Sequence, residues 1–334
     1  MPDLRASVIG LGMMGERHAR IWSELSYTEL VSVYDIVADK TESVASKLKC
    51  RAAASLEEAL DNDIDIVSIC TDDQHHVEPC QAAASAGAHI LLEKPLATTL
   101  QDCDAIIQSC EQNGVRLMVA HVVRFDPRYQ VGRSAIADGA VGDIVHVYAR
   151  RNNITASGRR IGPRTSVAYF LGVHDIDIMR WYTGAEIERV YAESSRKVLV
   201  SEGADDTIFT VMKFSDGAAG CLETCWVVPE GQPNTLDARI EVIGTTGRVA
   251  VQAGAVDDAV ITSTERASRA DVLYGPEVNG KLDGALRTQL EYFAESILND
   301  DEFLISAEDA RKSVAVASAI HESLETNAPV VLSE

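Results

Sequence analysis

Basic residues are scarce in this sequence. The chain of 334 residues has 30 lysines and arginines against 51 aspartates and glutamates, which gives a formal net charge of -21. Nucleic-acid binding depends on clustered cations that displace counterions, and an acidic surface also repels anionic lipids. We therefore expect no nucleic-acid partner and no membrane partner, and we interpret the acidity as a trait that favours solubility.

Long apolar runs and patterned cysteines are also missing. No stretch approaches the roughly 18 apolar residues that cross a bilayer, and the opening Met-Pro-Asp-Leu-Arg lacks the segments of a secretion leader. The seven cysteines form no Cys-x-x-Cys pair and have no zinc-finger spacing. We expect a cytoplasmic protein with no disulfide framework and no bound metal.

The first part of the chain alternates β-rich runs with helical patterns. Strands are expected at residues 7–10, 30–34, 64–70, 89–92 and 115–120, and helices at 16–25, 39–47, 77–86 and 100–112. Short connections between alternating strands and helices favour a parallel sheet covered on both faces. The pattern predicts an α/β, doubly wound Rossmann domain over residues 1–121.

After Phe125 the pattern changes to successive strands with turn signals between them. Strands are expected at 144–151, 190–194, 207–214, 218–227, 238–244 and 248–252, and helices at 126–137, 173–182, 286–298 and 307–323. This succession predicts an α+β domain with a large open, mostly antiparallel sheet over residues 122–334, its last helix free to pack back on the first domain. Such a sheet can also pair subunits.

The clearest motif is the glycine-rich run Gly10-Leu11-Gly12-Met13-Met14-Gly15, which follows one expected strand and opens a helix. In this context Gly10 permits the tight turn, Gly12 lets a pyrophosphate approach the backbone, and Gly15 allows close packing of helix on strand. The helix N-terminus supplies N–H groups for phosphates. We predict a dinucleotide site here, with Met13 and Met14 lining it; the alternative is an ordinary glycine-rich turn.

Asp35 ends the next expected strand. A carboxylate at this position can accept hydrogen bonds from both ribose hydroxyls and would repel a 2′-phosphate. No arginine follows it directly. The sequence therefore favours NAD over NADP as the cofactor.

Two further strand ends carry polar residues. Thr71, Asp72 and His76 follow the third strand, where they should border the cofactor because ligands bind at the carboxyl ends of parallel strands. Glu93 and Lys94 stand before a proline at the end of the next strand. The Lys94 ammonium can hydrogen-bond a substrate hydroxyl and help remove its proton; a surface salt bridge of Glu93 is the alternative.

Together with HVVRFDPRY (residues 121–129) and GVHDIDIMRWYTG (residues 172–184), these motifs resemble the glucose–fructose oxidoreductase and inositol dehydrogenase family of NAD(P)-dependent oxidoreductases. The resemblance spans essentially the whole chain. It implies a nucleotide-binding domain, then a substrate-binding domain whose sheet mediates a homodimer or homotetramer. It also implies oxidation or reduction of a secondary carbinol of a sugar or cyclitol.

The resemblance also implies roles for single residues. Lys94 would contact substrate and assist proton transfer, and His174 would be the general acid or base. Asp177, one helical turn beyond His174, would orient it or touch substrate. His121 and Arg124 would approach the nicotinamide and the substrate pocket.

Two features complicate the choice of substrate. Many family members have an aspartate four residues before the histidine, where this chain has Phe170. Either Asp175 or Asp177 takes its place, or the substrate or the reaction differs. In addition, five arginines lie close together at positions 150, 151, 159, 160 and 164. They form either a solvated loop or an anion-binding lip that includes Arg159 and Arg164.

Three functions follow from these observations. The first is an NAD-dependent dehydrogenase of a cyclic polyol or sugar, with a sugar-nucleotide or acidic-sugar 3-dehydrogenase as its variant. The second is a redox-neutral enzyme that keeps NAD tightly bound. The third is a nucleotide-binding sensor without catalysis, which the presence of both Lys94 and His174 disfavours.

Overall fold

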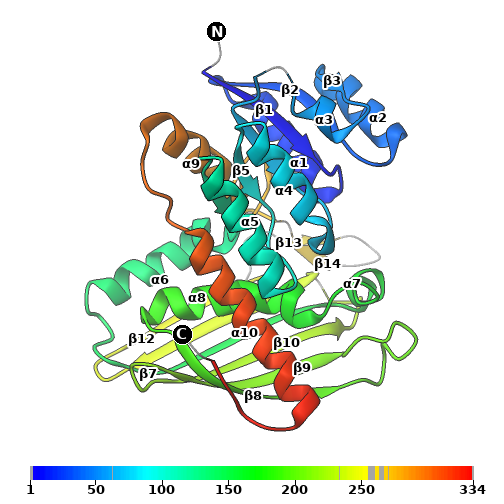
Figure 1. Cartoon of the computed structure of the whole chain (residues 1–334). Helices are drawn as coiled ribbons and strands as arrows, with labels where there is room; N and C mark the ends of the chain where they lie inside the picture. Colours follow the sequence, from blue (N-terminus) through cyan, green and yellow to red (C-terminus); the bar gives the residue numbers. More distant parts are fainter. Residues whose placement is uncertain are drawn as a thin grey trace. The chain divides into compact units, whose positions relative to one another are not determined.

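The computed structural model describes residues 3–61, 63–232, 234–254, 260–262, 267–269 and 271–332. The chain divides into two compact units (Figure 1). The first unit comprises Met1–Val122 and Tyr274–Arg311, and the second comprises Val123–Leu273 and Lys312–Glu334.

A six-stranded parallel sheet forms the centre of the first unit, with strand order β3-β2-β1-β4-β5-β6. The strands are β1 (Leu4–Ile9), β2 (Thr28–Tyr34), β3 (Arg51–Ala52), β4 (Ile66–Ile69), β5 (His89–Leu92) and β6 (Leu117–Val119). The order reverses between β1 and β4, and ligands of such sheets bind at this switch point, at the carboxyl ends of the strands. The predicted doubly wound Rossmann fold is confirmed.

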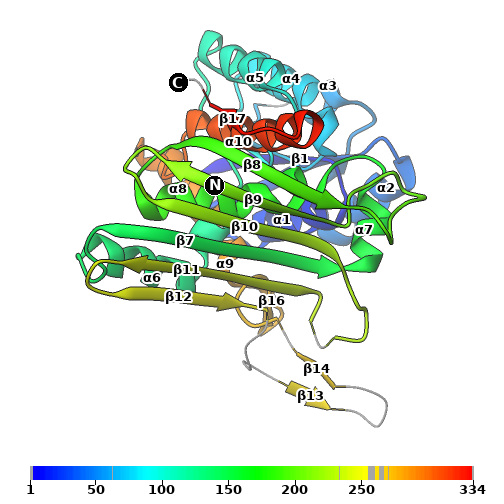
Figure 2. The same cartoon turned by 90° about the horizontal axis from the view of Figure 1, so that it is seen from below.

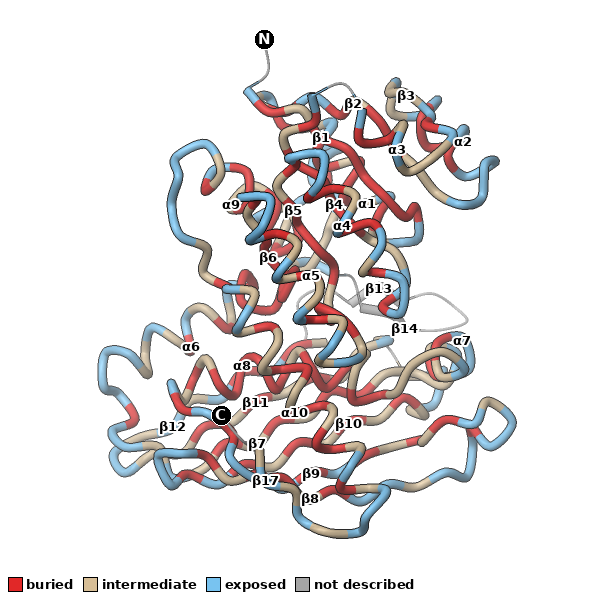
Figure 3. Tube along the Cα trace, viewed as in Figure 1, coloured by how far each residue is buried: buried red, intermediate tan, exposed pale blue. Residues whose placement is uncertain are grey.

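Helices cover this sheet: α1 (Met13–Glu24), α2 (Ala38–Leu48), α3 (Leu56–Ala59), α4 (Val77–Ser85), α5 (Leu100–Gln112) and α9 (Ala285–Asn299). The central strands are buried, as a parallel sheet with two covered faces requires (Figure 3). Helix α9 comes from late in the chain but belongs to this unit. Its Phe293 ring lies 6.4 Å from that of Trp22 on α1, a long-range contact that no local pattern predicts.

The second unit contains an open seven-stranded sheet with order β12-β11-β7-β10-β9-β8-β17 (Figure 2). The strands are β7 (Ile144–Ile154), β8 (Ile187–Ser195), β9 (Thr207–Phe214), β10 (Ala219–Val228), β11 (Leu236–Gly244), β12 (Arg248–Ala253) and β17 (Val330–Val331). Only the β7–β10 pair among them is parallel. The predicted open, mostly antiparallel sheet is confirmed.

One face of this sheet packs on helices. They are α6 (Pro127–Ala137), α7 (Thr155–Ile161), α8 (Val173–Thr183) and the part of α10 (Ala307–Thr326) that belongs to this unit. Along β7 and β10 the residues alternate, so Val147 and Leu222 are buried while Tyr148 and Glu223 are partly exposed. The alternation separates an inner face, toward the helices, from an outer face.

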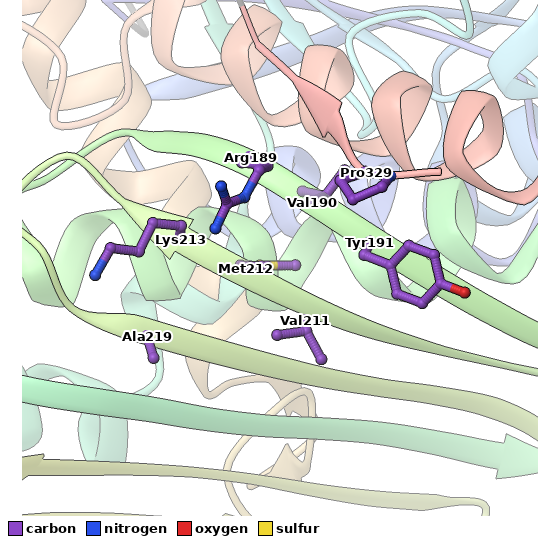
Figure 4. Close-up of a pocket in the computed structure, with 8 residues that line it drawn as sticks. All are labelled: Arg189, Val190, Tyr191, Val211, Met212, Lys213, Ala219 and Pro329. Atoms are coloured by element: carbon purple, nitrogen blue, oxygen red, sulfur yellow. The ribbon is translucent and has the colours of Figure 1, made fainter. Parts of the chain in front are cut away.

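The outer face carries a shallow depression across β8, β9 and β10 (Figure 4). Arg189 and Lys213 lie at one end of it and Tyr191 at the other, with Val211 between them. The residues that line it include none of the predicted site residues.

Two further antiparallel pairs of short strands are β13 (Val260–Thr262) with β14 (Ala267–Arg269), and β15 (Glu277–Val278) with β16 (Lys281–Leu282). Among the described residues, no helix has the length and apolar character needed to cross a bilayer.

Candidate active site

The three glycines of the β1–α1 loop face different surroundings. Gly10 has φ +85°, and a Cβ there would lie 2.7 Å from the backbone of Cys70 and Thr71. A Cβ on Gly15 would lie 1.8 Å from the carbonyl oxygen of Gly10. A Cβ on Gly12 would meet no atom within 4 Å. The fold itself requires Gly10 and Gly15, whereas Gly12 leaves open the space that a cofactor diphosphate needs beside the N-terminus of α1.

Asp35, which follows β2, is hydrogen-bonded to this loop. One carboxylate oxygen accepts the backbone N–H of Leu11 at 2.8 Å, and the other accepts that of Val37 at 2.9 Å. The Lys40 ammonium stands 4.0 Å from the first oxygen. A carboxylate oxygen has lone pairs for more than one donor, so the residues present fit an NAD diphosphate at Gly12 and ribose hydroxyls at Asp35.

His76 joins two loops at the same edge of the sheet. Its ring is buried, with Nε2 3.2 Å from the carbonyl oxygen of Thr71 and Nδ1 3.3 Å from that of Leu96. Burial lowers the pKa of His76, although the two carbonyl groups oppose that effect. The histidine therefore braces the loops that follow β4 and β5, while Asp72 beside it is exposed.

Glu93 and Lys94 follow β5. The Glu93 side chain is buried, and its Oε2 accepts the backbone N–H of Lys94 at 3.2 Å. Its Oε1 lies 3.4 Å from Nε2 of His18, a buried residue of α1. Burial raises the pKa of Glu93, but His18 and Lys94 outweigh it, and the net shift is downward. The Glu93 carboxylate is therefore held charged, and Lys94 beside it is half-buried.

Sequence reasoning missed His18. One signal was available, because His18 follows Gly15 by three positions and so shares the helix face that packs on the sheet. A histidine on that face would be expected to lie close to the ends of the strands. The helical periodicity alone could not name its partner, since Glu93 is distant in sequence.

His174 lies in the first turn of α8, directly after a π-helical turn formed by Ala168–Gly172. From Leu171 to Arg180 every residue is buried except His174, which is half-buried. A π-helical turn in front of a partly exposed histidine is an arrangement often found at functional sites. Phe170, where the resemblance implied an aspartate, is part of this turn, and its ring lies 6.4 Å from that of Trp226.

Asp177 and Arg124 form a two-pronged ion pair. Arg124 Nε donates to one oxygen of Asp177 at 2.9 Å and its Nη2 donates to the other at 2.7 Å. Both side chains are almost completely buried, and the guanidinium stands over the Trp181 ring at 5.4 Å. The structure thus brings two predicted site residues together, with the Asp177 carboxylate directed at Arg124. His121, the other residue expected there, is buried at the end of the first unit.

Asp175 is paired in the same manner with Arg151 of β7. Arg151 donates from Nε at 2.6 Å and from Nη2 at 3.2 Å to the two oxygens of Asp175, which is fully buried. Burial raises the pKa of Asp175, and Arg151 opposes that rise. Both carboxylates that were candidates to replace the aspartate absent at Phe170 are therefore engaged by arginines.

The five arginines at positions 150–164 do not share one surface. Arg151 lies on the inner face of the sheet with Asp175, whereas Arg150 lies on the outer face, 3.0 Å from Asp237. Arg159 and its neighbour on α7 are exposed, and Arg164 is half-buried. Arg159 and Arg164 remain as predicted anion-binding residues, without Arg150 and Arg151.

This fold, with a glycine loop open to a dinucleotide, defines an NAD-binding oxidoreductase. A family model described as the oxidoreductase family with an NAD-binding Rossmann fold matches residues 4–121, and the GFO/IDH/MocA C-terminal domain matches residues 129–250. The chain belongs to the glucose–fructose oxidoreductase and inositol dehydrogenase (GFO/IDH/MocA) family.

Three curated relatives match nearly the whole length of the chain. A myo-inositol 2-dehydrogenase of Thermotoga maritima is 28% identical and is covered over 99% of both chains. A scyllo-inositol 2-dehydrogenase (NAD(+)) of Bacillus subtilis is 28% identical over 99% of this chain and 96% of its own. A 2,7-anhydro-N-acetylneuraminate hydratase of Mediterraneibacter gnavus is 26% identical over 100% and 98%.

Solved structures share the fold. Scyllo-inositol dehydrogenase from Lactobacillus casei, with bound NAD(H) and scyllo-inositol, superposes with a TM-score of 0.84 at 22% identity over 98% of both chains. GenD2 from gentamicin A biosynthesis, in complex with NAD, superposes with a TM-score of 0.87 at 22% identity over 100% of this chain and 97% of its own.

Proposed function

We propose that this protein is an NAD-dependent dehydrogenase that oxidises a secondary ring hydroxyl of a cyclic polyol or sugar. The observation that carries the proposal is the glycine loop, where of its three glycines only Gly12 faces open space and where Asp35 accepts the N–H of the preceding Leu11. The curated inositol dehydrogenases that match over the whole chain support the substrate class. We also propose that the first unit binds the cofactor and the second binds the substrate.

NAD rather than NADP is the proposed cofactor. Asp35 presents a carboxylate fixed by two backbone N–H groups, which would repel a 2′-phosphate. Thr71, Asp72, Glu93 and Lys94 complete the proposed cofactor contacts at the carboxyl ends of β4 and β5.

In the proposed mechanism the chain's own residues manage the proton. Lys94 hydrogen-bonds the substrate hydroxyl, and His174, half-buried on α8, takes the hydroxyl proton as general base with the help of Lys94. A bound NAD supplies the hydride acceptor for the carbinol carbon. Arg124 and Asp177 position the start of α8 through their buried pair, and His121, Arg159 and Arg164 contribute to substrate binding.

The sheet of the second unit is the proposed contact between copies of the chain, as a homodimer or homotetramer. Its outer face exposes Phe209 and Val211 by about half of their surface. Apolar side chains grouped on a flat sheet favour association.

The test is NADH formation from NAD across a panel of inositols, free aldoses, uronic acids and UDP-sugars, with NADP in parallel. We expect turnover of one substrate class with NAD, and a loss of about 100-fold or more in kcat in Lys94→Ala and in His174→Ala. Retained NAD binding in both variants is the control. Full activity in either variant would remove that residue from the proposed proton transfer.

One alternative is a dehydrogenase of a sugar nucleotide or acidic sugar. Arg159 and Arg164 would then bind the anionic group. In the same panel, a double Arg159→Ala, Arg164→Ala variant should lose activity only toward charged substrates. Equal loss toward neutral substrates would contradict an anion-binding role.

A second alternative is a redox-neutral enzyme that keeps NAD bound. Phe170 favours it, because an apolar ring cannot accept a substrate hydrogen bond, and a curated relative is a hydratase. If no substrate of the panel gives NADH and NAD is retained through purification, this alternative is supported over the dehydrogenase.

A further inference from the structure

A buried chain of polar side chains links the core of the first unit to Glu93. Trp22 Nε1 donates to Ser68 Oγ at 2.8 Å, Ser68 Oγ lies 3.1 Å from Nδ1 of His18, and Nε2 of His18 lies 3.4 Å from Glu93 Oε1. Trp22, Ser68 and His18 are completely buried. This series of side chains ends at the backbone N–H of Lys94, which donates to Glu93 Oε2 at 3.2 Å.

The chemistry of these groups fixes which of them donates and which accepts along this series of side chains. The Trp22 indole can only donate, so Ser68 accepts from it and has its single hydroxyl proton left for Nδ1 of His18. Neutral His18 then carries its proton on Nε2, which faces Glu93. Trp22 and Ser68 therefore donate in the direction of His18, and the N–H of His18 lies on the side of the Glu93 carboxylate, 3.4 Å from Oε1.

A buried carboxylate without a partner such as His18 would take up a proton and lose its charge. Among the described residues, the charged or titratable groups that interact with Glu93 are His18 on α1, Lys94 on its own loop, the Cys70 thiol at the end of β4 and the buried His76. Of these, His18 and Lys94 stabilise the negative charge. If His18 is removed, Lys94 is left as the stabilising group.

We propose that His18 is a positioning residue for Lys94: it holds the Glu93 carboxylate against α1 and the backbone of Lys94, and so limits the pull of that carboxylate on the Lys94 ammonium. This inference rests on the proposed role of Lys94 as a group that gives up and takes a proton. A lysine whose proton is held less tightly serves that role better at neutral pH.

The test compares two amides at position 18. In His18→Gln the amide nitrogen reaches the place of Nε2 and stays next to Glu93, whereas in His18→Asn it reaches only the place of Nδ1, beside Ser68. Lys94 in the cofactor-free full chain is labelled with acetic anhydride, which reacts only with the neutral amine. Mass spectrometry of the digest measures the rate, and exposed Lys47 is the internal reference.

We expect labelling of Lys94 to be about three- to tenfold slower in His18→Asn, and to be close to the wild-type rate in His18→Gln. In the pH profile of kcat/KM, the fall in activity on the acidic side should begin at higher pH in His18→Asn only. The KM for NAD should stay unchanged. Equal labelling rates in the two variants, whether slowed or unchanged, would overturn the proposal.

Glu93→Gln keeps the shape of the side chain and removes its charge, so it tests the same idea if a substitution at His18 prevents folding. Lys94 should then be labelled faster than in the wild type, and an unchanged or slower rate would overturn the proposal. Because the labelling needs neither cofactor nor substrate, its outcome is separate from that of the substrate panel.

Discussion

At the scale of single residues, Gly12 differs from the two glycines beside it. Gly10 and Gly15 are fixed by contacts with the chain's own backbone, whereas Gly12 has φ -69° and open space where a side chain would be. A glycine that the fold does not need indicates a ligand that comes close to the backbone. A substitution of Gly12 should therefore affect mainly ligand binding, whereas a substitution of Gly10 or Gly15 should affect mainly the stability of the fold.

The pair Gly12→Ala and Gly15→Ala tests this separation. Gly12→Ala should change the free energy of unfolding by less than about 0.5 kcal/mol and raise the Kd for NAD about tenfold or more. Gly15→Ala should destabilise the fold by about 1–3 kcal/mol, because its Cβ has no room. Denaturant unfolding and calorimetric NAD binding measure both effects. Unchanged NAD affinity in Gly12→Ala would contradict a diphosphate at this loop.

Residues of local motifs could be placed from the sequence, and residues of long-range pairs could not. Gly10 and Gly15 were predicted in their roles because a turn between strand and helix has only a few solutions. The pairing of Arg124 with Asp177 joins residues far apart in the chain, so no spacing rule shows it. Asp177 was for this reason expected to serve His174 or substrate directly, which remains a prediction.

At the scale of elements, α8 shows how one helix combines structural and chemical roles. It is buried along almost its whole length, and its carboxylates Asp175 and Asp177 pair with arginines from β7 and from the turn before α6. Breaking a buried pair leaves the remaining charge without compensation. These two pairs therefore fix the position of α8, and with it that of His174.

Asp177→Asn should destabilise the protein by about 3–5 kcal/mol, because Arg124 stays buried without its counter-charge. The matched control is Arg150→Met, which breaks a partly exposed pair with Asp237 and should cost less than about 1 kcal/mol. Denaturant unfolding measures both. Lost activity with unchanged stability in Asp177→Asn would show instead that this carboxylate acts mainly on substrate.

Long elements with clear boundaries were predicted well. Helix α5 was predicted at its observed bounds, because Thr99 caps it by accepting from Asp102 N at 3.1 Å and a periodic apolar pattern follows. The two-residue strand β3, the four-residue helix α3, the seven-residue helix α7 and the π-helical turn at Ala168–Gly172 were not predicted. They are too short to show a period, and tertiary contacts decide them.

At the scale of the whole molecule, three histidines, the buried His76 and the half-buried His89 and His321, give both units a common response to acid. Burial lowers the pKa of His76, His89 and His321, so the folded chain keeps them neutral to lower pH than the unfolded chain does. The unfolded state takes up protons first as the pH falls through about 6.5. The stability that these neutral rings contribute is present above that pH and is lost below it.

We expect the free energy of unfolding to fall between about pH 7 and pH 5.5. Glu93 and Glu186, whose pKa values are lowered, contribute to the pH dependence only at more acid pH. Urea unfolding at fixed ionic strength measures the trend, and His89→Gln, at a half-buried position, should make the slope shallower. A flat or rising curve over this interval would contradict the expectation.

The chain leaves the first unit after Val122 and returns to it at Tyr274 to add α9. Arg116, beside β6, donates to the carbonyl oxygen of Ser296 on that helix at 2.8 Å. During synthesis on the ribosome, domains generally fold in the order in which they emerge. Here the Rossmann sheet must wait for α9, which leaves the exit tunnel only after most of the second unit has been made. The unit that starts first is thus completed late, and the surface of α1 around Trp22 stays uncovered until Phe293 of α9 reaches it.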